Sequence, residues 1–163
     1  MVSAVEAGRD AFGRQAWREA VVRLTAADVD AGLAAEDLER LATAAYLTGA
    51  GDCVDLWARA YQQCLAHGEA ARAARCAGWA SHALFEAGEV ARGGGWLSRA
   101  QVLIDEGGVD CAERGWLVVP QAFACFVEDP AGRWRVSRLP VRSPGASVTG
   151  ISRRWPGWGR GKP

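Results

Sequence analysis

A turn-like pattern that recurs along the chain is the strongest constraint on how this sequence can fold. Residues 15–20, 51–56 and 88–93 align with one another, so the pattern returns every 36 or 37 residues. The segments between these turns are rich in Ala, Leu, Arg and Glu, which are strong helix formers. A period in the mid-thirties therefore predicts repeated pairs of antiparallel helices.

Apolar residues at helical spacing predict seven helices. For example, Trp17, Val21 and Leu24 follow i, i+4, i+7 spacing and form one apolar stripe. We expect Gly49 to end the third helix and Asp52 to cap the start of the fourth. The predicted helices span residues 5–14, 16–27, 36–48, 53–66, 70–87, 90–104 and 111–127.

Two of the repeat units share a small–large–small order after the turn. The small residues would let two helix backbones lie close together, and the large one would fill the space opposite. In the middle unit Leu56, Ala60 and Gln63 invert this order, while Trp57 and Tyr61 supply bulk one residue later. The predicted repeat-packing residues are Ala20, Leu24, Ala27, Gly93, Leu97 and Ala100.

This order and this period resemble tetratricopeptide repeats. The resemblance implies an all-α fold, a tetratricopeptide-like array of about three antiparallel helix pairs plus one helix, followed by a disordered C-terminal tail. Helical-repeat arrays bind many kinds of ligand, so this resemblance implies an architecture and leaves the function open.

A narrower resemblance lies in five short segments of the sequence. The segments that carry it are GRDAF (8–12), EDLERLATAAYL (36–47), AARCA (73–77), GGWL (94–97) and CAERG (111–115). Together they resemble the N-terminal helical-repeat region of actinobacterial LuxR-type transcriptional regulators. That family implies a regulatory sensor or protein-interaction region, truncated here before the helix-turn-helix domain, so DNA binding is not expected from this chain alone.

Composition changes abruptly near residue 131. Residues 1–131 contain all 19 acidic residues and 11 of the 19 basic ones, whereas residues 132–163 contain eight basic residues and no acidic one. We therefore expect a helical domain at 1–130 and a disordered, basic Gly/Pro/Arg/Trp-rich tail at 131–163. Two hypotheses address the tail: weak binding of nucleic acid by Arg and Trp, or a frame-shifted reading of a fourth repeat.

Cysteine usage and the first residues predict a cytoplasmic protein. Residues 1–14 carry charges and no apolar run, unlike a signal peptide, and no membrane association is expected. The odd number of scattered cysteines favours reduced thiols: Cys53, Cys64, Cys76, Cys111 and Cys125.

The sequence favours structural roles over chemical ones for its cysteines and histidines. Cys64 with His67 and Cys76 with His82 do not follow the usual spacing of zinc ligands, which favours small core residues and helix-end histidines. No nucleophile elbow or phosphate loop is present, so we expect no catalytic residue, no cofactor, no metal and no enzyme activity. The triple glycine at 93–95 lies within the predicted helix 90–104, where it indicates either a flexible or close-packed point or, as we favour, a helix start delayed to Trp96.

The predicted last helix supplies a candidate interaction face. Pro120 should kink this helix or mark its start, and no later helix is predicted to cover its apolar side. The candidate residues are Trp116, Leu117, Phe123 and Phe126. We therefore expect a protein or peptide partner, or self-association through this face. A free-standing adaptor that binds a peptide or partner protein is the alternative to a regulator fragment.

Overall fold

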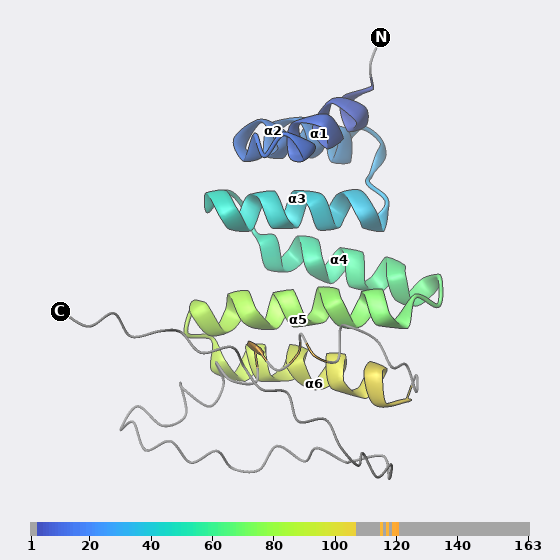
Figure 1. The fold of residues 1–163 in the computed structure, drawn as a ribbon, viewed down its shortest axis with the longest axis vertical. Coiled ribbons are helices and arrows are strands. Elements are labelled where there is room, and N and C mark those ends of the chain that lie inside the picture. Colours follow the sequence, from blue (N-terminus) through green and yellow to red (C-terminus); the bar gives the residue numbers. More distant parts are fainter. Residues whose placement is uncertain (1–2, 107–114, 116, 118, 121–163) are drawn as a thin grey trace, which may run out of the picture. The chain divides into compact units, whose positions relative to one another are not determined.

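Six helices make up the regular structure of the described residues (Figure 1). The computed structural model describes residues 3–106, 115, 117, 119 and 120. Within them every regular element is a helix, which confirms the all-α prediction. The helices are α1 (Ala4–Gly13), α2 (Trp17–Ala31), α3 (Ala35–Thr48), α4 (Cys53–Ala66), α5 (Ala70–Glu86) and α6 (Val90–Glu106).

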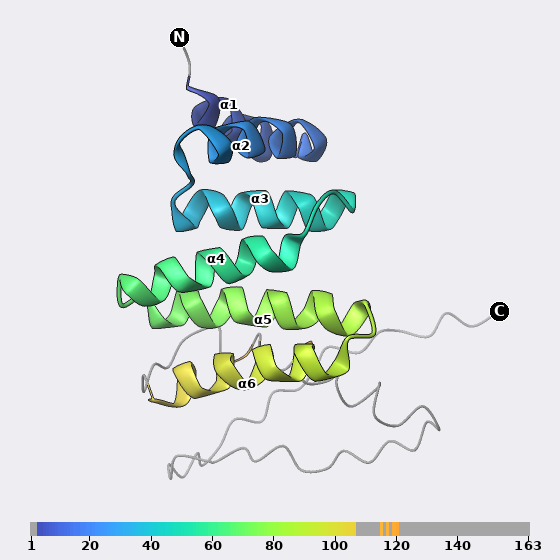
Figure 2. The same ribbon diagram turned by 180° about the vertical axis from the view of Figure 1, so that it is seen from behind.

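The helices form consecutive antiparallel pairs. Each helix packs against the next one in the chain, and α1 also contacts α3. Figures 1 and 2 show α3, α4, α5 and α6 as successive layers seen from opposite sides. We call α1–α2 the first unit, α3–α4 the second unit and α5–α6 the third unit.

The helix ends follow the local chemistry of the sequence. Gly49 ends α3 in the left-handed region with φ 66°, and the Asp52 carboxylate accepts hydrogen bonds from the Val54 and Asp55 amides at the start of α4. The predicted end of α3 at Gly49 and the predicted cap of α4 at Asp52 are thus confirmed. At α1, the Ser3 side chain and the Glu6 carboxylate form a reciprocal capping box.

Among the six described helices, every boundary except the end of α2 lies within two residues of the predicted one. Helix α2 continues four residues past the expected end, because its break comes only at Gly32, where φ is 74° and the Asp28 carboxylate accepts the Leu33 amide. Helix α6 begins at Val90, as the predicted span 90–104 has it, so the triple glycine lies inside the helix and the favoured interpretation of a start delayed to Trp96 is wrong. The physical reason is close packing, because a Cβ at Gly93 would lie 2.9 Å from the Phe85 ring.

The predicted repeat-packing residues all lie in the interior. Ala20, Leu24, Ala27, Gly93, Leu97 and Ala100 are buried. In the second unit the buried positions are Trp57, Tyr61 and Cys64, together with Ala60. The large buried side chains of the second unit, Trp57 and Tyr61, therefore lie one residue later than the corresponding positions of the other two units, as the sequence indicated. One core runs through the units and includes Leu24, Leu41 and Phe85.

Other expectations fall on residues that the structure describes only in part. Within 111–127 the described residues are 115, 117, 119 and 120; Leu117 lies in a turn, and residues 115, 119 and 120 are helical. The tail at 131–163 and its hypotheses lie outside the described residues. Among the described helices, none is both long and apolar enough to cross a membrane.

Candidate functional site

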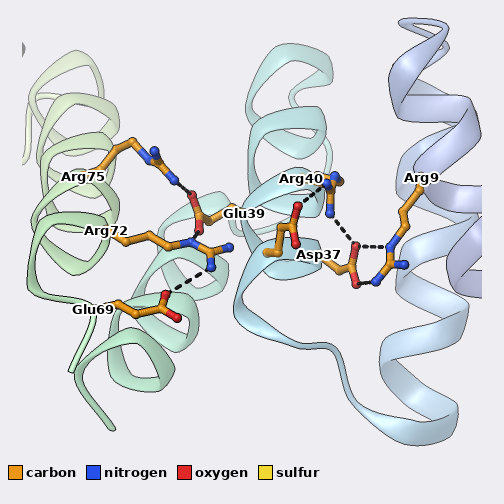
Figure 3. Close-up of polar contacts among 8 residues, drawn as sticks. Arg9, Asp37, Glu39, Arg40, Glu69, Arg72 and Arg75 are labelled. Atoms are coloured by element: carbon orange, nitrogen blue, oxygen red, sulfur yellow. Dashed lines mark hydrogen bonds and ion pairs between the residues drawn. The ribbon is translucent and has the colours of Figure 1, made fainter. Parts of the chain in front are cut away.

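Helix α3 carries two carboxylates that connect it to its neighbours on either side (Figure 3). The first is Asp37, whose side chain is only 2% exposed. Its two oxygens accept hydrogen bonds from Nε and Nη2 of Arg9 on α1, at 2.8 and 2.7 Å, and Arg40 donates a third at 2.9 Å. This bidentate contact between Arg9 and Asp37 joins α1 to α3 with a defined geometry.

The same contacts determine the charge state of Asp37. Hydrogen bonds from Arg9, and then its positive charge, hold the pKa of the Asp37 carboxyl below its usual range, although burial opposes the shift. The group is thus an anion in the folded protein at neutral pH. A buried carboxylate of this kind is stable only while its cationic partners remain in place.

The second carboxylate, Glu39, connects α3 to α5. Its Oε1 accepts a hydrogen bond from Arg72, and its Oε2 accepts one from Arg75 at 2.8 Å. Arg72 also donates to Glu69 at 3.1 Å (Figure 3). Charged side chains thus link the odd-numbered helices of all three units.

These side chains border a groove of about 510 Å³. Its lining comes from α1, α3 and α5 and consists of Phe12, Glu36, Glu39, Arg40, Thr43, Arg72 and Arg75. We call it the α1–α3–α5 groove. Arg40, Arg72 and Arg75 are 27%, 26% and 42% exposed, so their guanidinium groups reach solvent while they hold the carboxylates. Such a surface can exchange its internal ion pairs for charged groups of a ligand.

Two cysteine thiols lie close to the carboxylate of Glu39. Sγ of Cys64 on α4, Sγ of Cys76 on α5 and a carboxylate oxygen of Glu39 all lie within 4.8 Å of one another. Both cysteines are buried, and removal from water raises the pKa of each thiol, that of Cys76 far above its usual range. These three side chains are the metal-binding candidates among the described residues.

The structure places the two histidines away from this group. His67 is exposed, and its Nδ1 lies 2.7 Å from the Gln63 carbonyl oxygen. His82 pairs with Glu86 and packs against the Trp79 ring. The four-residue combination considered from the sequence, with Cys64 and Cys76 joined by histidines, is therefore not assembled.

A cluster of packed aromatic rings lies largely between the second and third units. Trp57 stacks on Trp79 with ring centroids 5.8 Å apart, and Tyr46 packs against both. Burial, then a hydrogen bond to Glu86, raises the pKa of Tyr46 to about 12. Trp96 and Tyr61 line a separate cavity of about 450 Å³ on α4 and α6. Within the described part of the chain, Trp57, Trp79 and Trp96 thus take part in aromatic packing.

The candidate interaction face on the last predicted helix is only partly described. Leu117 is 3% exposed and packs with the main core cluster, so it does not belong to an open face. Trp116, Phe123 and Phe126 lie outside the described residues.

Sequence reasoning missed the groove, although one signal for it was present. Glu39 and Arg75 are 36 residues apart, which is one repeat length, so they occupy equivalent positions on α3 and α5. Opposite charges at such a spacing can pair across neighbouring units of a helical array.

Comparisons of the chain with protein-family models, with curated proteins and with solved structures find no significant match in any of the three.

Proposed function

We propose that this protein is a helical-repeat protein-interaction module, the tetratricopeptide-like sensor region of a LuxR-type transcriptional regulator. It binds a cytoplasmic partner through the α1–α3–α5 groove. The observation that carries the proposal is the groove itself, which crosses all three units and presents both arginines and carboxylates to solvent. The sequence segments that resemble those of the regulator family and the 36- to 37-residue period support the proposal.

The chemistry of the groove suggests what kind of partner it takes. Arg40, Arg72 and Arg75 offer planar donor groups that match carboxylates, while Glu36 can accept from a basic side chain. Phe12 adds an apolar surface near one end. An extended or helical peptide segment that carries several acidic residues fits this lining, because it can replace Glu39 and Glu36 as the partner of the arginines.

Site-specific photo-crosslinking in the source cells tests the groove. A photoreactive residue at Thr43, which lines the groove, should capture a discrete partner protein. The same residue at Val22, which is 67% exposed on α2, is the matched control and should capture none of it. Equal capture from both positions would contradict the groove assignment.

Charge reversal makes the test specific. Arg75→Glu should abolish the crosslink from Thr43, because the groove then repels an acidic segment. Arg99→Glu, which changes the separate cavity on α4 and α6, should leave it intact.

The gene itself separates the regulator from a free-standing adaptor. A reading frame that continues downstream into a helix-turn-helix sequence supports the regulator. Partner capture without such a frame supports the adaptor.

A further inference from the structure

We propose that Glu39, Cys64 and Cys76 form a binding site for a thiophilic divalent metal ion such as Zn²⁺. The donors come from α3, α4 and α5, and their ligand atoms lie within 4.8 Å of one another. In a tetrahedral zinc site, with Zn–S near 2.3 Å and Zn–O near 2.0 Å, ligand atoms are separated by about 3.5–3.8 Å. The ligand atoms therefore need to approach one another by at most about 1 Å, which is within the range of side-chain rotation.

The repeat register argues that Cys64 is more than a packing residue. The buried positions of the second unit fall one residue later than in the sequence alignment, so Cys64 takes the buried place that Ala27 has on α2 and Ala100 has on α6. The core thus accepts alanine at this position. The second unit instead has a thiol, and it faces a second thiol, that of Cys76, across α4 and α5.

The surrounding charges are compatible with a dication. Binding would follow M²⁺ + 2 RSH → M(SR)₂ + 2 H⁺, in which two metal–sulfur bonds replace two S–H bonds and both protons pass to solvent. The net charge of the site is unchanged, because one divalent ion replaces two protons. Thiolates and carboxylates are established ligands for zinc.

Arg72 and Arg75 would act as outer supports of the site. They hold the two oxygens of Glu39 by hydrogen bonds, and each oxygen retains a second lone pair for a metal. Such outer contacts orient a metal ligand. Because Glu39 also lines the α1–α3–α5 groove, an ion can enter from the groove, and a water molecule can complete the coordination there.

Cobalt binding to the reduced full-length protein tests the proposal. Co²⁺ should produce the thiolate-to-metal charge-transfer and visible absorption bands of a tetrahedral site at one equivalent, and Zn²⁺ should displace it. A pH indicator in weak buffer should register release of two protons per metal ion. The absence of these bands from the wild-type protein would overturn the proposal.

Three variants and one control localise the site. Cys64→Ala should remove the bands and remain folded, because alanine occupies the equivalent positions of the other units. Cys76→Ser should also remove them, and Glu39→Gln should weaken binding at least tenfold. Cys53→Ser, at a partly buried cysteine outside the group, should bind as the wild type does.

Thermal melting gives an independent readout. Zn²⁺ should raise the melting temperature of the wild-type and Cys53→Ser proteins and leave that of Cys64→Ala unchanged. Retention of the cobalt bands or of the zinc-dependent shift in Cys64→Ala would overturn the site. The metal site does not depend on the partner of the groove, so either proposal can fail without the other.

Discussion

Ion pairs cross both junctions between units, because Glu39 on α3 accepts from Arg72 and Arg75 on α5, but among the described residues the second junction adds packed aromatic rings. Bidentate ion pairs cross the first junction: Arg9 holds Asp37 between α1 and α3, and Arg59 holds Asp28 between α2 and α4 at 2.6 and 2.7 Å. At the second junction, aromatic rings pack between units. Trp57 stacks on Trp79, and Tyr61 meets Trp96 edge to face.

These two solutions have different physical consequences. Buried aromatic surface stabilises a junction in proportion to its area and depends little on pH. An ion pair between units adds less net free energy, because desolvation offsets attraction, but it fixes the register of the helices. The stability of the first junction should thus depend mainly on charge and pH, whereas the second, which also contains the Glu39 ion pairs, should depend more on buried volume.

The largest effect should come from truncating the aromatic junction. Trp57 is 1% exposed, and Trp57→Ala should lower the free energy of unfolding by about 3–5 kcal/mol through lost burial and a residual cavity. Urea titration followed by circular dichroism measures the loss. Trp17→Ala removes a partly exposed ring within the first unit and should cost clearly less. Equal losses would contradict the contrast between the junctions.

Asp37→Asn should be the strongest single change at the first junction. It removes the anion that accepts from Arg9 and Arg40, and should lower the free energy of unfolding by about 2 kcal/mol. Asp10→Asn is the matched control, since Asp10 also pairs with an arginine but is 69% exposed. Its effect should be too small to resolve. A similar loss in both variants would show that burial of Asp37 is irrelevant.

The stability difference between the wild type and Asp37→Asn should also depend on pH. Hydrogen bonds from Arg9 lower the folded-state pKa of Asp37 relative to the unfolded value of about 3.9. A depressed carboxyl pKa contributes stability that is fully present above the unfolded value and is lost as pH falls through the folded one. Urea midpoints of the two proteins should therefore be far apart at neutral pH and converge in acid. A constant gap would contradict this assignment.

Local helix signals made much of the fold predictable. The helix pairs and the Asp52 cap depend on residues close in sequence, and all were predicted. The late end of α2 was missed because its Asp28 carboxylate is stabilised by Arg59, a contact that local sequence does not reveal. The triple glycine was misjudged for a similar reason, since the nearness of Phe85 to Gly93 arises only when α5 and α6 pack.

The candidate site was less accessible from sequence because it depends on helix register across units. The sequence places Cys64 and Cys76 on successive predicted helices. It does not reveal that Glu39, on the helix before them, lies beside both thiols. Several acidic residues, such as Glu36 and Asp55, have an arginine four residues away, so local spacing does not distinguish the carboxylates that join units. Only the stacked geometry selects Asp37 and Glu39 as the carboxylates that join three units.

The smallest effects should distinguish close packing from helix propensity within the third unit. Gly93 and Gly94 both lie inside α6, but a Cβ at Gly93 would meet the Phe85 ring at 2.9 Å, whereas one at Gly94 would meet nothing within 4 Å. Gly94→Ala should therefore stabilise the protein by about 0.5–1 kcal/mol through helix propensity. Gly93→Ala gains the same propensity but must displace a buried ring, which costs about 1–3 kcal/mol, so its net effect is a loss of about 1 kcal/mol. Paired urea titrations measure the opposite signs. Stabilisation by both substitutions would show that α5 and α6 can separate freely, and that the third unit is held by its aromatic contacts rather than by its glycine.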